Sequence, residues 1–234
     1  MCGRFVQKIE RKVVQKQFGV KQPVPVDWRP RYNLAPGQPA AIVVEGAHGP
    51  RLDAAVWGLI PAWTKPGQIG HRPINARVES VWSKPSFRNP LRYRRCLVPA
   101  NGFYEWQSLS RSRSAAKQPD FFYLPDTPYL ALAGLWDVWN DGQGGEVFTV
   151  CIITRPANHS MRPFHNRMPL ILQEPEVAAW LDHRLFRPAD LEPILSAGDV
   201  ALQQHAVSGK VNRVDYDTAA CMERVIVEEQ TTLI

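Results

Sequence analysis

Short apolar segments bounded by glycine, proline and asparagine dominate this sequence, and they do not alternate regularly with helical segments. Seven of them have the length and β-branched content of strands: residues 40–44, 52–58, 95–99, 102–107, 121–124, 129–135 and 147–154. A doubly wound parallel sheet needs a helix after nearly every strand, so this pattern excludes it. We predict an α+β fold: one β-rich domain over residues 1–234, mostly antiparallel sheet curled into a barrel-like core, with short flanking helices.

Turn signals place the remaining elements. Asn101-Gly102 is a favoured tight-turn pair and predicts a hairpin between residues 95–99 and 102–107. The run Asp141–Gly145 predicts a second hairpin turn. Apolar residues at helical spacing predict short helices within residues 7–18, after Pro175, and over residues 188–195. We expect loops at residues 32–37, 60–75 and 108–118, the last of them mobile.

Composition limits the class of protein. Hydrophobic residues make up 44% and charged residues 21% of the 234 residues, which excludes general disorder. No apolar run reaches about 18 residues, and the first residues lack the apolar region of a secretory signal. The four cysteines are widely spaced, so we expect neither disulfides nor a zinc site. We therefore expect a monomer without metal, cofactor or membrane contact, in the cytoplasm and nucleoid-associated in a bacterium.

Positive charge is concentrated in one stretch. The chain carries a net charge of +6. Residues 80–119 hold one acid, Glu105, and eight basic residues: Lys84, Arg88, Arg92, Arg94, Arg95, Arg111, Arg113 and Lys117. A solvated face explains such a run, and so does a surface for polyanions such as nucleic acid, because clustered Lys and Arg attract phosphates without regard to sequence.

Cys2 offers unusual chemistry. Its small size predicts removal of Met1, which leaves an α-amine of pKa about 7.7–8.0 and a thiol of pKa about 8.5 on one carbon. This 1,2-aminothiol can condense with an aldehyde to an imine, which the thiol closes to a five-membered thiazolidine. On position alone, an incidental cysteine is the favoured interpretation of Cys2.

Ordered motifs give this cysteine a context. Six blocks follow the start Met1–Phe5: Arg31–Pro36, Trp57–Trp63, Asn75–Glu79, Arg95–Trp106, Thr154–Asn158 and His165–Pro169. Together they resemble the SRAP (SOS response-associated peptidase) family from residue 2 to about Asn212. The segment 108–118 and the residues after Asn212 match no motif.

The resemblance implies a sensor and shield of abasic sites in single-stranded DNA, crosslinked through a Cys2 thiazolidine, with weak lyase or reversal activity. It implies that His165 shuttles protons to open the abasic sugar, a task that suits imidazole at neutral pH. It also implies that Glu105 transfers protons at the Cys2 amine and that Asn75 holds a hydroxyl or that amine. Without the resemblance, His165 reads as structural, Glu105 as an ion-pair partner of an arginine, and Asn75 as a turn residue.

The same resemblance implies a DNA surface. Guanidinium groups suit the phosphates that flank a lesion, and aromatic rings stack on bases. The residues expected to contact DNA are Arg4, Arg77, Arg167, Trp63, Pro36, Asn33, Trp106 and Thr154. We expect Arg77 to share one face of an extended segment with Asn75, and Arg167 with His165, because each follows its partner by two positions. Glu79 is expected to be a structural partner of one arginine.

Two alternatives from other classes stay open. Cys2, Asn75, Glu105 and His165 also supply the nucleophile, base and polar groups of a cysteine peptidase, whose obvious substrate is the chain's own first peptide bond. The basic stretch alone is compatible with a non-covalent binder of single-stranded DNA in which Cys2 is incidental.

Overall fold

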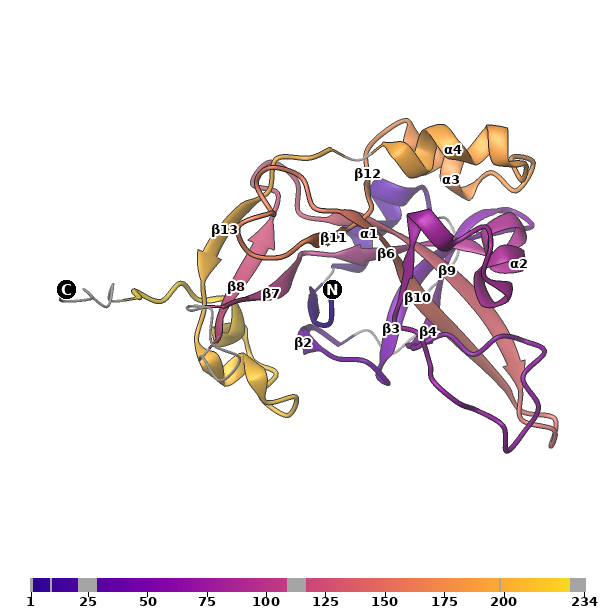
Figure 1. Ribbon diagram of the computed structural model, residues 1–234, viewed down its shortest axis with the longest axis horizontal. Coiled ribbons are helices and arrows are strands. Elements are labelled where there is room, and N and C mark those ends of the chain that lie inside the picture. Colours follow the sequence, from indigo (N-terminus) through magenta and orange to yellow (C-terminus); the bar gives the residue numbers. More distant parts are fainter. Residues whose placement is uncertain (1, 9, 21–28, 109–116, 198, 228–234) are drawn as a thin grey trace.

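Five strands of the larger sheet close into a barrel (Figure 1). The computed structural model describes residues 2–8, 10–20, 29–108, 117–197 and 199–227. The barrel strands are β3 (Pro39–Gly46), β4 (Gly49–Trp57), β6 (Arg95–Ala100), β9 (Leu130–Asn140) and β10 (Glu146–Pro156). Strand β10 pairs with β9 on one side and, in parallel, with β4 on the other, which closes the ring. The predicted α+β class and the barrel-like core are confirmed.

Short strands extend the barrel at its open ends. They are β5 (Asn75–Arg77), β11 (Arg167–Pro169) and β12 (Ile171–Leu172). Strand β5 runs parallel to β10 and β11 runs antiparallel to it, and both pair with Thr154. Strands β5 and β11 therefore flank the end of β10 on opposite edges.

A second, antiparallel sheet has the order β13-β8-β7-β1-β2. Its strands are β1 (Phe5–Gln7), β2 (Arg31–Leu34), β7 (Gly102–Ser108), β8 (Lys117–Tyr123) and β13 (Gln203–Ala206). In Figure 1, β7, β8 and β13 lie to the left and the barrel strands β3, β4, β9 and β10 to the right.

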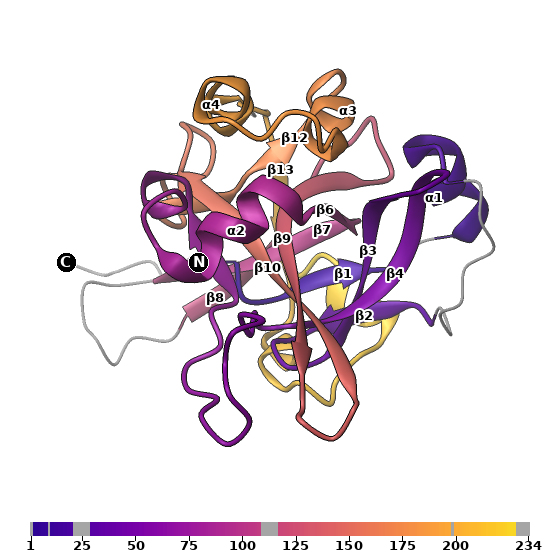
Figure 2. The same ribbon diagram turned by 90° about the vertical axis from the view of Figure 1, so that its right-hand side faces the viewer.

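Four short α-helices surround the barrel strands (Figure 2). They are α1 (Arg11–Phe18), α2 (Pro85–Tyr93), α3 (Glu176–Leu181) and α4 (Pro188–Ser196). The described part of the chain also has three 3₁₀ helices, η1 (Val78–Ser80), η2 (Gly209–Asn212) and η3 (Ala219–Met222). The helices predicted within 7–18, after Pro175 and over 188–195 are present, whereas residues 5–7 form a strand. No helix in the described part of the chain is long and apolar enough to span a membrane.

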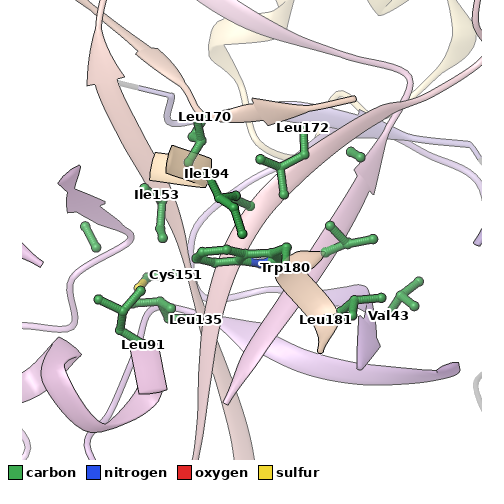
Figure 3. Close-up of a cluster of buried hydrophobic side chains, with 14 of the residues drawn as sticks. Val43, Leu91, Leu135, Cys151, Ile153, Leu170, Leu172, Trp180, Leu181 and Ile194 are labelled. Atoms are coloured by element: carbon green, nitrogen blue, oxygen red, sulfur yellow. The ribbon is translucent and has the colours of Figure 1, made fainter. Parts of the chain in front are cut away.

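Alternation along the barrel strands creates two separate apolar clusters. One face contributes Val43, Leu135 and Ile153, which pack against all four helices around the fully buried Trp180 (Figure 3). The other face contributes residues such as Ile42 and Ile152, which pack against the second sheet. Because side chains alternate across a strand, each barrel strand supplies both clusters. Cys2 belongs to the cluster between the sheets.

The predicted hairpin at Asn101-Gly102 is wrong. Strands β6 and β7 do not pair; β6 joins the barrel and β7 joins the second sheet. Asn101 lies at the corner where the chain changes sheets, and its side chain accepts a hydrogen bond from the Lys8 amide and donates one to the Pro128 carbonyl. A Cβ on Gly102 would lie 2.4 Å from the Phe122 carbonyl oxygen, so this corner requires glycine.

Other turn predictions have mixed outcomes. The turn Asp141–Gly145 joins β9 to β10 as predicted, and residues 60–75 hold no helix or strand before β5. The loop predicted at 32–37 is partly wrong, because β2 extends to Leu34. Of the predicted mobile loop at 108–118, residues 108 and 117–118 lie in paired strands, and 109–116 lie outside the described residues.

The basic stretch does not form one surface. Arg95 is fully buried, and its guanidinium donates to the carbonyl oxygens of Leu91, Arg92, Trp180 and Asp182. It therefore holds α2 and α3 against the barrel and is unavailable to a polyanion. Arg94 forms an ion pair with the buried Asp137. Lys84, Arg88 and Lys117 are exposed, and Arg111 and Arg113 lie outside the described residues.

Candidate active site around Cys2

Cys2 lies in the interior between the two sheets, with none of its surface exposed. Strand β1 holds the start of the chain between β2 and β7. The amide of Tyr104 donates to the carbonyl of Arg4, which extends the β1–β7 pairing by one residue toward Cys2. This antiparallel register brings the first residues of the chain to the part of β7 that carries Glu105.

The Cys2 thiol is kept protonated. Burial raises its pKa far above the ordinary value, and the negative charge of Glu105 raises it further. The thiol lies 3.9 Å from the Arg4 carbonyl oxygen. A nucleophilic cysteine that acts as a preformed thiolate needs the opposite environment, with positive charge and a lowered pKa.

Asn75 holds Cys2 from the side of the barrel. It begins β5, opposite Ile152 of β10, and its Nδ2 atom donates a hydrogen bond of 2.9 Å to the Cys2 carbonyl oxygen. This bond fixes which amide atom is nitrogen, because only nitrogen can donate. The remaining Oδ1 atom is buried and has no hydrogen-bond partner among the described residues. A buried acceptor beside Cys2 is suited to hold an amine or a hydroxyl.

Glu105 reaches the same place from the second sheet. It lies on β7, is 4% exposed, and its charge acts on the Cys2 thiol. Directly opposite, on β8, is a second carboxyl that sequence reasoning missed, Asp120. The prediction that Asn75, Glu105 and Cys2 form one site agrees with this placement, although their roles in a reaction stay predictions.

His165 is presented by a tight turn. Its backbone amide donates to the Met161 carbonyl, and the preceding Phe164 packs edge-on against Phe122 and on the cluster that contains Cys2. The amide of Arg167 donates to Nδ1 at 2.9 Å. This shorter contact favours the neutral tautomer with its proton on Nε2 over the one in which Nδ1 donates to the Arg167 carbonyl at 3.2 Å. The backbone bends at Asn166. His165 and Arg167 therefore do not share the extended segment that the two-residue spacing predicted.

Arg167 is committed to neighbouring groups. Its guanidinium forms an ion pair with Glu79 through both carboxylate oxygens and donates to the carbonyl and hydroxyl of the buried Thr154. The hydrogen bonds from Arg167 to Glu79 lower the pKa of Glu79, whose carboxyl is half-exposed. The prediction that Glu79 is a structural partner of an arginine is confirmed. Thr154 serves as an anchor for Arg167.

Three predicted DNA contacts lie on the surface. Arg77 is exposed and follows Asn75 on β5, with the intervening Ala76 buried, so the predicted shared face of Asn75 and Arg77 is confirmed. Trp63 is 66% exposed and Pro36 is also exposed. The Ala62 amide donates to Asp137, which fixes the loop directly before Trp63. The ring is therefore presented outward on an anchored loop.

Arg4, Asn33 and Trp106 instead bind the C-terminal segment. The Arg4 guanidinium donates to Asn33 and to the carbonyls of Val211 and Asn212. Asn33 is fully buried and donates to the carbonyls of Val211, Arg213 and Tyr216. Trp106 donates to the Asn212 side chain. The buried Asn33 has no surface for DNA.

Sequence reasoning also missed the part played by residues beyond Asn212. Asp217 accepts hydrogen bonds from the amides of Tyr32 and Asn33 and pairs with Arg31 at 2.6 Å. Asp217 thus holds β2 in place. An isolated Asp followed by no motif gave no sequence signal for this contact.

Comparison with known proteins agrees with the geometry. A family model described as SOS response associated peptidase (SRAP) matches residues 1–214. The chain is 37% identical over 214 residues to the abasic site processing protein YoqW of Bacillus subtilis (strain 168), covering 91% of this chain and 94% of that protein. It is 32% identical over 236 residues to the abasic site processing protein HMCES of Gallus gallus, covering 83% and 66%.

A solved structure shares the fold. An X-ray structure of a protein from Bacteroides thetaiotaomicron is 25% identical, with a TM-score of 0.84, and the match covers 96% of this chain and 100% of that one.

Proposed function

The chain belongs to the SOS response associated peptidase (SRAP) family, and from this premise we propose that it captures abasic sites in single-stranded DNA. The capture is covalent: Cys2, which becomes the N-terminal residue after removal of Met1, forms a thiazolidine with the ring-opened sugar. Relatives named abasic site processing proteins support the substrate class. The bound product shields the lesion.

The observation that carries this proposal is the setting of Cys2. It is fully buried, tied by Asn75 and close enough to Glu105 for the carboxylate to raise the thiol pKa. A sugar without its base needs less room beside a buried Cys2 than an intact nucleotide does. The burial of Cys2 therefore favours an abasic substrate over normal DNA.

The state of the thiol sets the order of steps. Because the thiol stays protonated, the α-amine attacks the aldehyde carbon first and forms a carbinolamine. Glu105 accepts a proton from the attacking amine and returns it to the hydroxyl, which leaves as water and gives the imine. The thiol then adds across the C=N bond, with its proton passing to the nitrogen. The net change is the loss of one water.

His165 and Asn75 assist from the barrel side. An abasic sugar is mostly a closed hemiacetal, which must open before the aldehyde can react. With Nδ1 accepting the Arg167 amide, His165 presents Nε2 to donate and recover a proton during ring opening. The unpartnered Oδ1 of Asn75 holds the Cys2 amine toward the carbonyl carbon.

The DNA surface divides into contacts and supports. We assign phosphate contact to the exposed Arg77 and stacking to Trp63, with Pro36 on the other wall. Arg167 holds the turn of His165 through Glu79 and Thr154. Arg4, Asn33 and Trp106 hold the C-terminal segment. Reversal of the imine, or β-elimination through it, accounts for a weak lyase activity.

The site is less suited to a cysteine peptidase. Peptidases of that class depend on a thiolate stabilised by a neighbouring imidazolium or helix N-terminus. Here burial and a carboxylate raise the pKa of the thiol instead. Processing of the first peptide bond of the chain stays the one reaction of that class compatible with this position.

A denaturing gel tests the proposal. Untagged protein incubated with an abasic single-stranded oligonucleotide is expected to give a heat-stable shifted band, and Cys221→Ser, which alters another buried cysteine, is expected to retain it. Cys2→Ser keeps the amine, so it forms only a reversible imine that borohydride traps. An added N-terminal residue removes the free aminothiol and abolishes the band. Full crosslinking by the extended protein contradicts the proposal.

A further inference from the structure

Two buried carboxyl groups lie directly opposite each other in the second sheet. Glu105 of β7 pairs with Asp120 of β8, and directly paired residues of antiparallel strands point to the same face. Each is 4% exposed. Like charges in opposed positions destabilise a sheet, and burial makes the cost larger. The reaction proposed above uses Glu105 and leaves Asp120 without a task.

The surroundings of Asp120 favour its neutral form. Its Oδ2 atom is buried and has no hydrogen-bond partner among the described residues. Burial raises its pKa to about 6, an effect that His205 on β13 opposes. The ring of His205 lies on the other face of the sheet, against Phe121 and Tyr123, and is bonded to the Met222 carbonyl.

Other charged groups lie on the neighbouring elements. Lys117 begins the same strand and is exposed. Lys210 of η2 lies over the Tyr216 ring. His165 follows Phe164, which packs on Phe122 two residues from Asp120. Among the groups on these elements, Glu105 is the one that shares the face of Asp120 as its direct cross-strand partner.

We propose that Asp120 is a positioning residue that acts through Glu105, so that its negative charge keeps the transferred proton on Glu105 until Glu105 passes it to the hydroxyl of the carbinolamine. This inference rests on the proposed function. When the amine gives its proton to Glu105, an ionised Asp120 opposes a second negative charge beside it. Glu105 then passes the proton to the hydroxyl, which leaves as water, and Asp120 ends the cycle unchanged.

The proposal predicts a pH dependence that belongs to Asp120. Above about pH 6 Asp120 is charged and favours the protonated form of Glu105 after the proton transfer; below that pH Asp120 is neutral and this effect is lost. Asp120→Asn keeps the shape and removes the charge at every pH. We expect this variant to crosslink about tenfold more slowly at neutral pH, the factor that corresponds to one pKa unit, and to lose the rise in rate near pH 6.

The test is the single-turnover crosslinking rate at saturating abasic oligonucleotide from pH 5 to 8.5. Asp120→Glu retains the charge and is expected to restore the rise, whereas Asp126→Asn, which removes an exposed acid just beyond β8, leaves the profile unchanged. The DNA concentration at half-maximal rate is expected to stay constant, since Asp120 does not touch DNA. An Asp120→Asn profile that superimposes on that of the original protein overturns the proposal.

A second measurement needs no DNA. Carboxyl carbon NMR of the whole protein follows the titration of Asp120, whose pKa is expected to fall in Glu105→Gln because the opposed charge is gone. An unchanged Asp120 titration overturns the pairing. If the original protein forms no adduct at all, the proposed function fails, and this titration still decides whether the two carboxyls are coupled.

Discussion

The side-chain amide of Asn75 donates a 2.9 Å hydrogen bond to the backbone carbonyl of Cys2. Asn75 belongs to a strand that extends the barrel, and Cys2 precedes a strand of the second sheet. The contact therefore joins the two sheets at Cys2, and the position of Cys2 depends on both of them.

Removing this bond is expected to slow capture without abolishing DNA binding. Asn75→Ala releases the Cys2 carbonyl and deletes the Oδ1 acceptor, at a cost of about 0.5–1.5 kcal/mol for the bond alone. We expect a crosslinking rate lower by roughly tenfold or more, because orientation of the amine is lost. Single-turnover rates on gels, with melting curves to verify folding, measure the effect. A variant as fast as the original protein contradicts a role for Asn75.

Two arginines should respond differently to salt. Arg77 is exposed, so Arg77→Ala is expected to weaken DNA binding and reduce the salt slope by about one. Arg167 is paired with Glu79, so Arg167→Ala is expected to leave the slope unchanged while slowing crosslinking through the His165 turn. Fluorescence anisotropy at several salt concentrations distinguishes them. Equal slopes for both variants would show that this division is wrong.

Trp63 is expected to act through its ring. Its side chain is 66% exposed, and loss of base stacking costs about 1–3 kcal/mol. Trp63→Ala should weaken binding of single-stranded DNA by that amount, whereas Trp63→Phe should retain most of it. Binding of both variants at one salt concentration is the measurement. If alanine and phenylalanine bind equally well, stacking does not operate at this position.

Asp120 should make folding stability depend on pH. Burial raises its pKa to about 6 in the folded state, from an ordinary value of 3.8. Between these values the folded protein binds more protons than the unfolded chain, so the free energy of unfolding falls as pH rises, by up to about 3 kcal/mol. The loss is complete about one pH unit above that pKa.

Urea unfolding of the original protein and Asp120→Asn at pH 4 and pH 7 measures this contribution. Titrating groups that do not interact with Asp120 are common to both proteins and cancel in the comparison. The free energy of unfolding of Asp120→Asn, relative to that of the original protein, is expected to be higher at pH 7 than at pH 4. A difference that is the same at both pH values contradicts the raised pKa.

Local patterns were sufficient for the five barrel strands, but not for helix α2, for short strands such as β1 and β5, or for the pairing of the strands. Alternating and β-branched runs identify the barrel strands, and the glycine-rich run Asp141–Gly145 forms the turn it predicts. Asn101-Gly102 has the same local signal as a hairpin turn, yet it is a corner between sheets. Strand β6 is paired with β3 on one edge and with β9 on the other, which leaves no edge for β7. Such long-range pairings leave no mark in a short window of sequence.

The site shows the same limit. Motif resemblance grouped Cys2, Asn75, Glu105 and His165 in one predicted site. In the structure Asn75 contacts Cys2 and the charge of Glu105 acts on the Cys2 thiol, whereas the roles of all four stay predictions. The buried guanidinium of Arg95 donates to carbonyls of α2, of α3 and of Asp182 directly after α3. A count of charges along the sequence cannot detect these partners, so it assigned Arg95 to a surface. Asp120 became visible only through the β7–β8 register, since no motif includes it.

The central claim is a covalent bond between Cys2 and the abasic sugar, and an intact-mass spectrum tests it most directly. Untagged protein is measured before and after incubation with an abasic single-stranded oligonucleotide. The account predicts a starting mass without Met1 and a heat-stable product equal to protein plus DNA minus one water, absent for Cys2→Ser. A protein that has lost Met1 and forms no such product contradicts it.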